Sequence, residues 1–215
     1  MVLIDLFKKC RVVGLVGDVG EGKSSLGLNE ILDIRKKIDI DIYVLGVEPS
    51  LHNYLEKKGI KVLKSKEDLL DMKIKGSVIF VDEFADLYKV QSNDRQLHRI
   101  KKFFNRIEHL NNYVLISTAQ SKFWNSFMCS IVRNFIIKSV EFDNLVNGTT
   151  LKRKIKGITE NTSEYRLETP KNTFFVITND DIVKKMTFDY NPKIDSKKEK
   201  NNPFKKSEEK IVKRK

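Results

Sequence analysis

Eight residues near the start of the sequence, Gly17 to Ser24 (GDVGEGKS), place glycines, a lysine and a hydroxyl at a fixed spacing. Glycines allow successive backbone N–H groups to turn toward one anion. Lys23 can neutralise the outer phosphates of a nucleotide, and the Ser24 hydroxyl can ligate Mg²⁺. A glycine turn that only connects a strand to a helix needs neither side chain, so the pattern predicts a phosphate-binding loop. The predicted nucleotide-binding residues are Gly17, Asp18, Val19, Gly20, Glu21, Gly22, Lys23, Ser24 and Ser25.

A pair of adjacent carboxylates, Asp82 and Glu83, follows the apolar run 78–81. At the end of a buried strand, Asp82 can hold a Mg²⁺ ion together with Ser24. Glu83 points differently and can orient and deprotonate a water that attacks the γ-phosphate. Apolar strands that end in Asp are common, so the glycine loop gives this pair its meaning. Together the two motifs predict hydrolysis rather than phosphate transfer to an organic acceptor.

A third candidate is the amide of Gln120, which follows the apolar strand predicted over 113–117. A polar side chain at such a strand end can reach the γ-phosphate and detect its loss. A glutamine in this place is usually only a loop residue, so the assignment depends on the other two motifs. We expect Gln120 to act as the sensor of a catalytic set that also contains Lys23 and Glu83.

The elements that must position these residues alternate between strands and helices. Because parallel strands need crossover connections, this order predicts an α/β fold with a mostly parallel sheet flanked by helices. Asn147-Gly148 is a strong hairpin signal and opens a more polar, β-rich region. Strands are predicted over 12–16, 40–45, 60–63, 78–81, 113–117, 135–140, 149–158, 165–168 and 173–178, and helices over 24–37, 51–58, 67–72, 94–110 and 123–132.

Composition excludes several classes of protein. A chain of 215 residues with 40% apolar residues can fill the core of one domain. With 33% charged residues it has no apolar run of membrane-spanning length, and we expect an intracellular protein that does not contact the membrane. The two cysteines, Cys10 and Cys129, are too few for a disulfide scaffold or a metal cage, so we expect inert thiols.

The net charge of +12 favours a polyanionic partner. The last 25 residues carry ten Lys and Arg against four acids, so half of the excess lies there. This tail is either a solvated disordered end or a phosphate-binding segment. We predict an ATPase core over 1–142, a β-hairpin-rich extension packed on it over 143–190, and a basic, disordered tail over 191–215.

With these motifs in this order, residues 10–140 resemble the FtsK/HerA superfamily of DNA-pumping ATPases, in particular its small viral genome-packaging members. The resemblance lies in the segments 81–87 (VDEFADL), 117–120 (STAQ) and 130–140. It implies a RecA-like (ASCE) P-loop core in which the Gln120 strand lies between the loop strand and the Asp82 strand, and a homo-oligomeric ring, often of six subunits. The chain departs from the larger translocases because no membrane or DNA-reading domain fits in it, which favours the compact packaging type. It also has Ala119 between the Thr and the Gln of the sensor motif.

Ring motors of this class complete each active site with an arginine from the neighbouring subunit, because a guanidinium stabilises charge on the transferring phosphoryl group. Arg106 is the first candidate, and Arg133 and Arg99 are alternatives. Each of the three could instead be a surface residue in an ion pair.

Contacts with the phosphates of DNA suit a motor that must move along any sequence. Lysines in the predicted hairpin could equally protect an exposed strand edge. Trp124, with Phe123 and Phe127, could stack on nucleobases, although packing inside the protein is favoured. The predicted DNA contacts are Lys89, Arg95, Arg99, Lys152, Arg153, Lys154 and the C-terminal lysines.

The sequence thus predicts a DNA-translocating ATPase, the genome-packaging motor of a virus or provirus. It would use ATP and Mg²⁺, act on double-stranded DNA, and work in the host cytoplasm or transiently at the virion with a capsid or portal component. One alternative is an assembly or secretion ATPase like those of filamentous phages. Others are a small P-loop kinase and a basic nucleic-acid-binding protein with a vestigial nucleotide site.

Overall fold

The computed structural model describes residues 2–70, 74–87, 94–119, 123–147, 149–158, 166–167, 169–170, 172–178 and 183–187. The predicted sensor Gln120, Lys89 and the tail 191–215 lie outside this part of the chain. The helices are α1 (Val2–Phe7), α2 (Lys23–Lys37), η1 (Pro49–Leu51), α3 (His52–Glu56), α4 (Lys66–Leu70), α5 (Phe84–Leu87), α6 (Asp94–His109), α7 (Ser126–Ile131), η3 (Phe142–Asn144) and α8 (Thr150–Ile158). The strands are β1 (Val12–Val16), β2 (Ile42–Leu45), β3 (Lys61–Val62), β4 (Val78–Val81), β5 (Tyr113–Ser117), β6 (Asn134–Ile137), β7 (Val140–Glu141), β8 (Arg166–Leu167), β9 (Thr173–Ile177) and β10 (Val183–Thr187).

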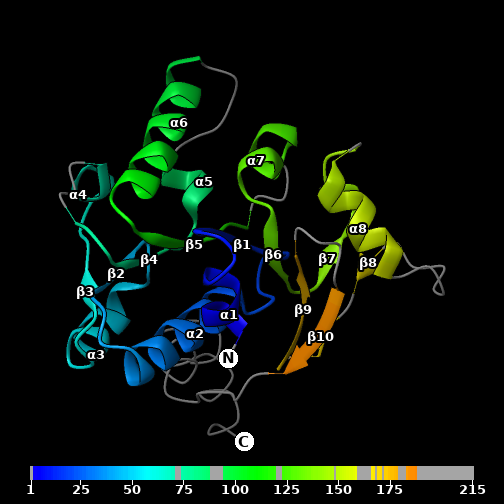
Figure 1. Cartoon of the computed structure of the whole chain (residues 1–215). Coiled ribbons are helices and arrows are strands. Elements are labelled where there is room, and N and C mark those ends of the chain that lie inside the picture. Colours follow the sequence, from blue (N-terminus) through cyan, green and yellow to red (C-terminus); the bar gives the residue numbers. More distant parts are fainter. Residues whose placement is uncertain are drawn as a thin grey trace, which may run out of the picture.

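The main sheet has eight strands in the order β10-β9-β6-β1-β5-β4-β2-β3 (Figure 1). All pairs from β6 to β3 are parallel, whereas β9 runs antiparallel to both β6 and β10. The α/β fold with a mostly parallel sheet is therefore confirmed. The order places β5 between β1 and β4, so the carboxyl ends of these three strands meet at one edge of the sheet.

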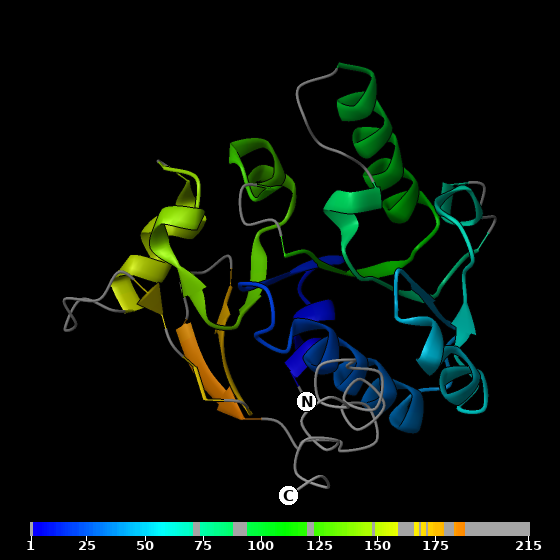
Figure 2. The same cartoon turned by 180° about the vertical axis from the view of Figure 1, so that it is seen from behind.

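Helices cover both faces of the sheet, with α1, α2 and α3 on one face and α5, α6 and α7 on the other (Figures 1 and 2). Strand residues alternate between two hydrophobic clusters, because successive side chains of a strand point to opposite faces. In β4, Val78 and Phe80 pack with α2, while Ile79 and Val81 pack with α5 and α6. Burial on both faces explains why the parallel strands read as uninterrupted apolar runs.

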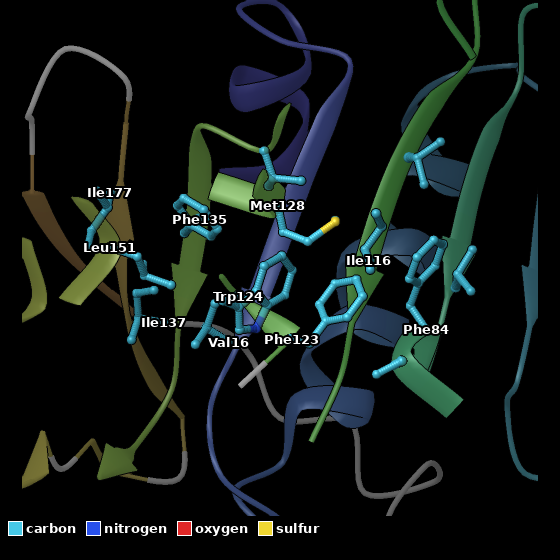
Figure 3. Close-up of a cluster of buried hydrophobic side chains, with 14 of the residues drawn as sticks. Val16, Phe84, Ile116, Phe123, Trp124, Met128, Phe135, Ile137, Leu151 and Ile177 are labelled. Atoms are coloured by element: carbon cyan, nitrogen blue, oxygen red, sulfur yellow. The ribbon is translucent and has the colours of Figure 1, made fainter. Parts of the chain in front are cut away.

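Aromatic rings fill the core beneath α5, α6 and α7 (Figure 3). Trp124 is fully buried and makes edge-to-face contacts with Phe123, at 5.1 Å between ring centroids, and with Phe135, at 5.5 Å. Both Trp124 and Phe123 are therefore core residues, and stacking of either ring on a nucleobase is excluded in this structure. Phe127 is half-buried.

The strand predicted over 149–158 is wrong, because this segment forms the helix α8. Leu151 and Ile155 are both buried and stand four residues apart, which is the spacing of a helical face. Thr149 Oγ1 accepts a hydrogen bond from Lys152 N at 3.2 Å and caps the helix. The hairpin signal at Asn147-Gly148 misled the prediction, since alternating lysines fit a strand equally well when burial is unknown.

Beyond α8, the chain returns to the sheet instead of forming a separate unit. The predicted strands over 165–168 and 173–178 correspond to β8 and β9, and β9 continues the main sheet beside β6. Elements that were not predicted include α1, α5, η3 and β10. A capping box opens α4, with Asp68 N donating to Ser65 Oγ at 3.1 Å and Ser65 N donating to Asp68 Oδ2 at 2.9 Å.

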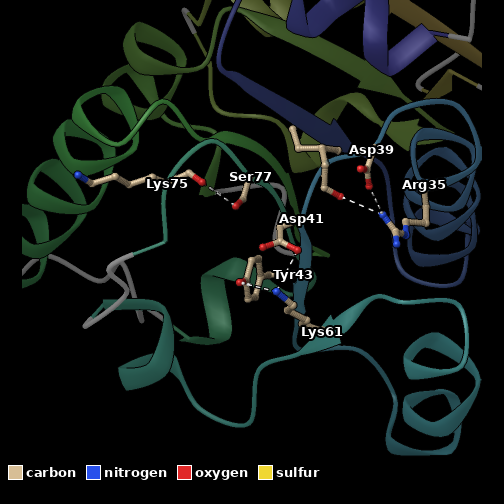
Figure 4. Close-up of polar contacts among 8 residues, drawn as sticks. Arg35, Asp39, Asp41, Tyr43, Lys61, Lys75 and Ser77 are labelled. Carbon is tan, nitrogen blue, oxygen red and sulfur yellow. Dashed lines mark hydrogen bonds and ion pairs between the residues drawn. The ribbon is translucent and has the colours of Figure 1, made fainter.

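Polar contacts connect side chains at the surface around β2 and its neighbours (Figure 4). Lys61 Nζ lies 2.9 Å from Asp41 Oδ1 and donates to Tyr43 Oη at 3.2 Å. Arg35 pairs with Asp39 at 3.4 Å on the C-terminal turn of α2. These groups are largely exposed, so such pairs contribute little to stability. In the described part of the chain, no helix is both long and apolar enough to cross a membrane.

Gly46 gives the clearest test of how the fold shapes the end of β4. Gly46 has φ +79°, and a Cβ added to it would lie 2.2 Å from Asp82 O, whereas Gly76 has φ +63° with open space around it. Alanine in this backbone region costs about 1–2 kcal/mol, so Gly76→Ala should lose about that much. We expect Gly46→Ala to lose more, on the order of 3 kcal/mol or above, because the backbone must also move. Urea unfolding of both variants checks this, and equal losses would contradict it.

Candidate nucleotide site

The segment after β1 forms a loop whose backbone leaves donors exposed to a ligand. Gly20 and Gly22 adopt φ +81° and +82°, a region that side chains disfavour, and nothing would contact a Cβ at either position. Gly22 precedes α2 and makes no side-chain capping bond. Gly22 therefore offers no side chain to the first N–H groups of this 15-residue helix, an end that can bind an anion and where the helix dipole favours one.

Lys23 is 5% exposed, and its Nζ donates to Asp18 O at 2.6 Å. Burial lowers the pKa of Lys23, and the negative charges of Glu83 and Asp82 oppose that effect. The ammonium thus bridges the loop from inside through the carbonyl of Asp18. A triphosphate would add negative charge beside it and favour its protonated form.

A pocket of about 510 Å³ lies in front of the loop. Its wall combines the glycine loop and the start of α2 with the ends of β4 and β5 and with two residues from later in the chain. It is lined by Val19, Gly20, Glu21, Gly22, Lys23, Ser24, Ser25, Glu83, Ala119, Lys138 and Thr169. The predicted loop residues from Val19 to Ser25 and the predicted base therefore share one pocket. Gly17 is buried, and Asp18 bonds through its backbone N to Ser139 O.

Glu83 is held in an unusual conformation at the edge of this pocket. Its φ is +50°, in the left-handed region that non-glycine residues rarely adopt and that concentrates at functional sites. Its Oε2 accepts a hydrogen bond from Ala119 N at 2.9 Å, so the carboxylate is tied to the end of β5. This contact fixes Glu83 next to Ala119, the residue before the predicted sensor Gln120. The geometry suits a carboxylate that must receive a proton from a positioned water.

Asp82 lies behind the pocket wall. It is 5% exposed, and its carboxylate accepts a hydrogen bond from the Ser117 hydroxyl of β5. Mg²⁺ commonly keeps several waters and takes only one or two protein carboxylates. Ser24 lines the pocket and Asp82 does not, so the Mg²⁺ site at these two residues stays a prediction. In the described residues, no cluster of three or more His, Cys, Asp or Glu offers a competing metal cage.

Asp18 joins the phosphate loop to the segment after β6. Its backbone N donates to Ser139 O at 2.8 Å, and its carboxylate accepts from Glu141 N at 2.8 Å and from Asn144 Nδ2 at 3.2 Å. Gly17 is required beside this contact, because a Cβ there would lie 2.9 Å from the Cβ of Lys138. The loop is therefore supported from residues more than 120 positions away in sequence.

Lys138 and Thr169 complete the pocket and were not predicted. Lys138 is 1% exposed, and its Nζ donates to Thr173 O at 2.6 Å and to Pro170 O at 3.1 Å. Burial lowers the pKa of Lys138. Ser139 bonds to Thr169 through its hydroxyl, which accepts from Thr169 N at 3.0 Å. No local motif marks these residues. The one feature of the sequence that could have indicated Lys138 is its position after a parallel strand, since a parallel neighbour of β1 must end beside the loop.

The candidate arginines lie away from the phosphate pocket. Arg99 and Arg106 of α6 line a separate pocket of about 270 Å³ together with Glu67 and Lys102. Arg133 lies at the opposite edge of the sheet, just before β6. Among the described residues, no arginine lines the nucleotide pocket itself. The assignment of Arg106, with Arg133 and Arg99 as alternatives, therefore stays a prediction.

The predicted row of DNA-binding lysines does not form, because α8 is a helix. Lys152 is 8% exposed, and its Nζ donates to Asn147 Oδ1 at 2.8 Å and to Leu145 O at 3.2 Å. Lys154 Nζ donates to Thr178 O at 3.0 Å. Both ammonium groups thus bond to oxygens of the protein itself, and the predicted DNA contacts stay a prediction. Arg153 and Arg99 are exposed, and Arg95 lies on α6.

Both cysteines lie half-buried, and burial raises the pKa of each thiol to about 11. Thiolates are the reactive form, so Cys10 and Cys129 are poor nucleophiles at neutral pH.

The Asp18 contacts predict a measurable stability effect. Asp18→Ala removes the acceptor for two hydrogen bonds to the 141–144 segment and leaves the backbone carbonyl that binds Lys23. We expect a loss of about 1–2 kcal/mol in the free energy of unfolding, measured with urea. Asp5→Ala is the matched control, since the Asp5–Lys8 pair is exposed to solvent and should leave the midpoint unchanged. An unchanged midpoint for Asp18→Ala would show that the loop does not depend on this support.

Neither a protein-family model nor a curated protein sequence matches the chain. Among solved structures, it is similar to B204, the DNA-packaging ATPase from Sulfolobus turreted icosahedral virus, with a TM-score of 0.64 and 14% identity, covering 84% of this chain and 98% of B204. It is also similar to B204 from Sulfolobus turreted icosahedral virus 2 in complex with ATP-γS, with a TM-score of 0.56 and 16% identity, covering 82% of this chain and 97% of that one. The pCW3 conjugation coupling protein TcpA gives a TM-score of 0.60 and 15% identity, covering 86% of this chain and 61% of TcpA. At these identities the likeness is one of fold, and the chain has the RecA-like α/β fold of these P-loop NTPases, as the resemblance to the FtsK/HerA superfamily implied.

Proposed function

We propose that this protein is an ATP hydrolase that moves double-stranded DNA, as the packaging motor of a virus or provirus. The observation that carries the proposal is the position of Glu83, strained in backbone, bonded to Ala119 N and facing the same pocket as the glycine loop and Lys23. A phosphate site alone would serve a kinase or a vestigial binding protein. A carboxylate held beside that site supports attack by water.

The chain's own residues divide the chemistry as follows. Backbone N–H groups of the loop and the ammonium of Lys23 bind and orient the phosphates. Glu83 orients the attacking water and accepts its proton. Bound Mg²⁺, held by Ser24 and Asp82, would supply positive charge to the phosphate oxygens. Gln120, which comes directly after Ala119 in the sequence, would detect the loss of the γ-phosphate.

Two further observations support the DNA motor over other hydrolases. The net charge of +12 suits a polyanionic substrate. The fold is shared with B204 and TcpA, a DNA-packaging ATPase and a conjugation coupling protein, respectively. A ring of subunits would let Arg106, Arg99 or Arg133 reach a neighbour's nucleotide, since no described arginine lines the pocket from within. A capsid or portal component would be the further partner.

Substitutions at Lys23 and Glu83 test the hydrolytic mechanism. Lys23→Ala should weaken ATP binding, because the cation inside the loop is lost. Glu83→Gln should keep ATP affinity and lower turnover by about 10²–10⁴-fold, the range for loss of a general base. Glu56→Gln, an exposed substitution on α3, is the control and should behave like wild type. Full turnover by either active-site variant, measured as phosphate release alongside titration calorimetry, would refute the mechanism.

Duplex DNA separates the motor from an ATPase that works on protein subunits. Adding DNA at low salt should raise the rate of ATP hydrolysis, and raising the salt concentration should reverse this effect because counterion release drives binding. Activity per subunit should also rise steeply with protein concentration if the active site is shared. Hydrolysis that ignores DNA at low salt would favour the protein-handling alternative.

A further inference from the structure

A groove that the proposed mechanism does not use opens at the edge of the sheet opposite the nucleotide pocket. Its volume is about 690 Å³. Its walls are the segment before β1, the start of β6, the C-terminal half of α6 and the end of α7. The nucleotide pocket lies at the carboxyl ends of the parallel strands, whereas this groove lies at their amino ends. A five-residue strand such as β1 separates the two edges by about 17 Å.

Positive charge converges on this groove from three parts of the chain. Lys9 and Arg11 precede β1, Lys101 lies on α6, and Arg133 precedes β6. Glu108 is the one acidic residue in the described lining. Lys9, Lys101 and Arg133 are exposed, so their charges reach solvent.

The side chains in the groove are arranged to bind an anion. Lys101 Nζ lies 5.5 Å from the ring centroid of Phe127, and this contact holds the ammonium at the groove without neutralising it. Arg133 Nε donates to Ser130 O at 3.3 Å. That contact uses one of the five donors of a guanidinium.

Arg11 supplies a more specific signal. Its guanidinium lies 5.5 Å from the ring centroid of Tyr113, and Nη2 donates to Asn111 Oδ1 at 2.9 Å. Nη1 is buried and has no hydrogen-bond partner in the described part of the protein. An unsatisfied buried donor is costly, so this side chain would gain a hydrogen bond by turning toward an anion in the groove.

We propose that this groove is a contact site for the phosphate backbone of duplex DNA. The inference rests on the proposed function, in which DNA is the substrate, and assigns that contact to residues that the sequence analysis did not select. Lysines and arginines from separate elements can each meet a different phosphate, and such contacts need no base sequence. Because the groove and the nucleotide pocket lie at opposite edges, both can be filled at once. The strand β1 joins them directly, since it begins after Arg11 and ends before Gly17.

Charge reversal tests the groove. The variant Lys9→Glu/Lys101→Glu changes two exposed groove residues, and Lys57→Glu/Lys58→Glu makes the same change in net charge at the exposed end of α3. Binding of a fluorescent 30-base-pair duplex is measured by anisotropy over a salt series. We expect the groove variant to bind at least about 10-fold more weakly, with a salt slope shallower by about 2, from about 0.9 per lost phosphate contact. The control should stay close to wild type, and unchanged thermal unfolding and ATP affinity would show that the groove variant is folded.

The other outcomes overturn the inference in distinguishable ways. Equal losses in both variants would mean that DNA responds only to total charge. Full DNA binding by the groove variant, with wild type also binding, would place the DNA contact elsewhere and leave the proposed function standing. If the groove variant instead lost oligomer mass in light scattering while keeping DNA affinity, the groove would be a contact between subunits. Wild-type protein that hydrolyses ATP but binds no DNA would remove both this inference and the DNA half of the proposed function.

Discussion

A loop that gathers backbone N–H groups around an anion combines a buried lysine with left-handed glycines, and neither feature favours folding of the loop by itself. The rest of the structure supplies the missing support. Asp18 connects the loop to the segment after β6 through hydrogen bonds at 2.8 to 3.2 Å, and Lys23 occupies its interior through Asp18 O. These contacts fix the loop both from inside and from a distant segment of the chain, so the fold itself preorganises it.

The two carboxylates at the end of β4 are likewise positioned by contacts with other parts of the chain. Asp82 is shielded and bonded to Ser117, whereas Glu83 turns through a left-handed backbone to reach the pocket. Two adjacent residues thus receive different environments, which is the condition for different roles. Gly46 makes the turn possible because only hydrogen fits against Asp82 O. The geometry of the candidate site thus depends on a residue with no reactive group of its own.

The region after β6 is part of the site and not an appendage. Lys138 and Ser139 tie the 169–173 segment to the pocket, and β9 extends the main sheet beside β6. A displacement of the phosphate loop would therefore displace this region as well, because close-packed interiors transmit strain. At the other edge, the groove around Arg11 begins where β1 begins, so one strand connects the nucleotide loop with a basic surface.

The sequence by itself determined the phosphate loop, the Asp82-Glu83 pair, the alternation of strands and helices, and the strands β1, β4 and β5 almost to the residue. These features depend on local spacing, on apolar runs and on residues with few substitutes, so neighbours along the chain are enough to reveal them. Only the tertiary structure decided that Asp18 is bound by Glu141 and Asn144, and that Lys138 lines the pocket. It also decided that 150–158 is a helix, because the choice between a strand and a helix depended on which face of Leu151 and Ile155 could be buried. Contacts between residues more than 100 positions apart leave no periodic trace in a single sequence, since only the folded chain brings them together.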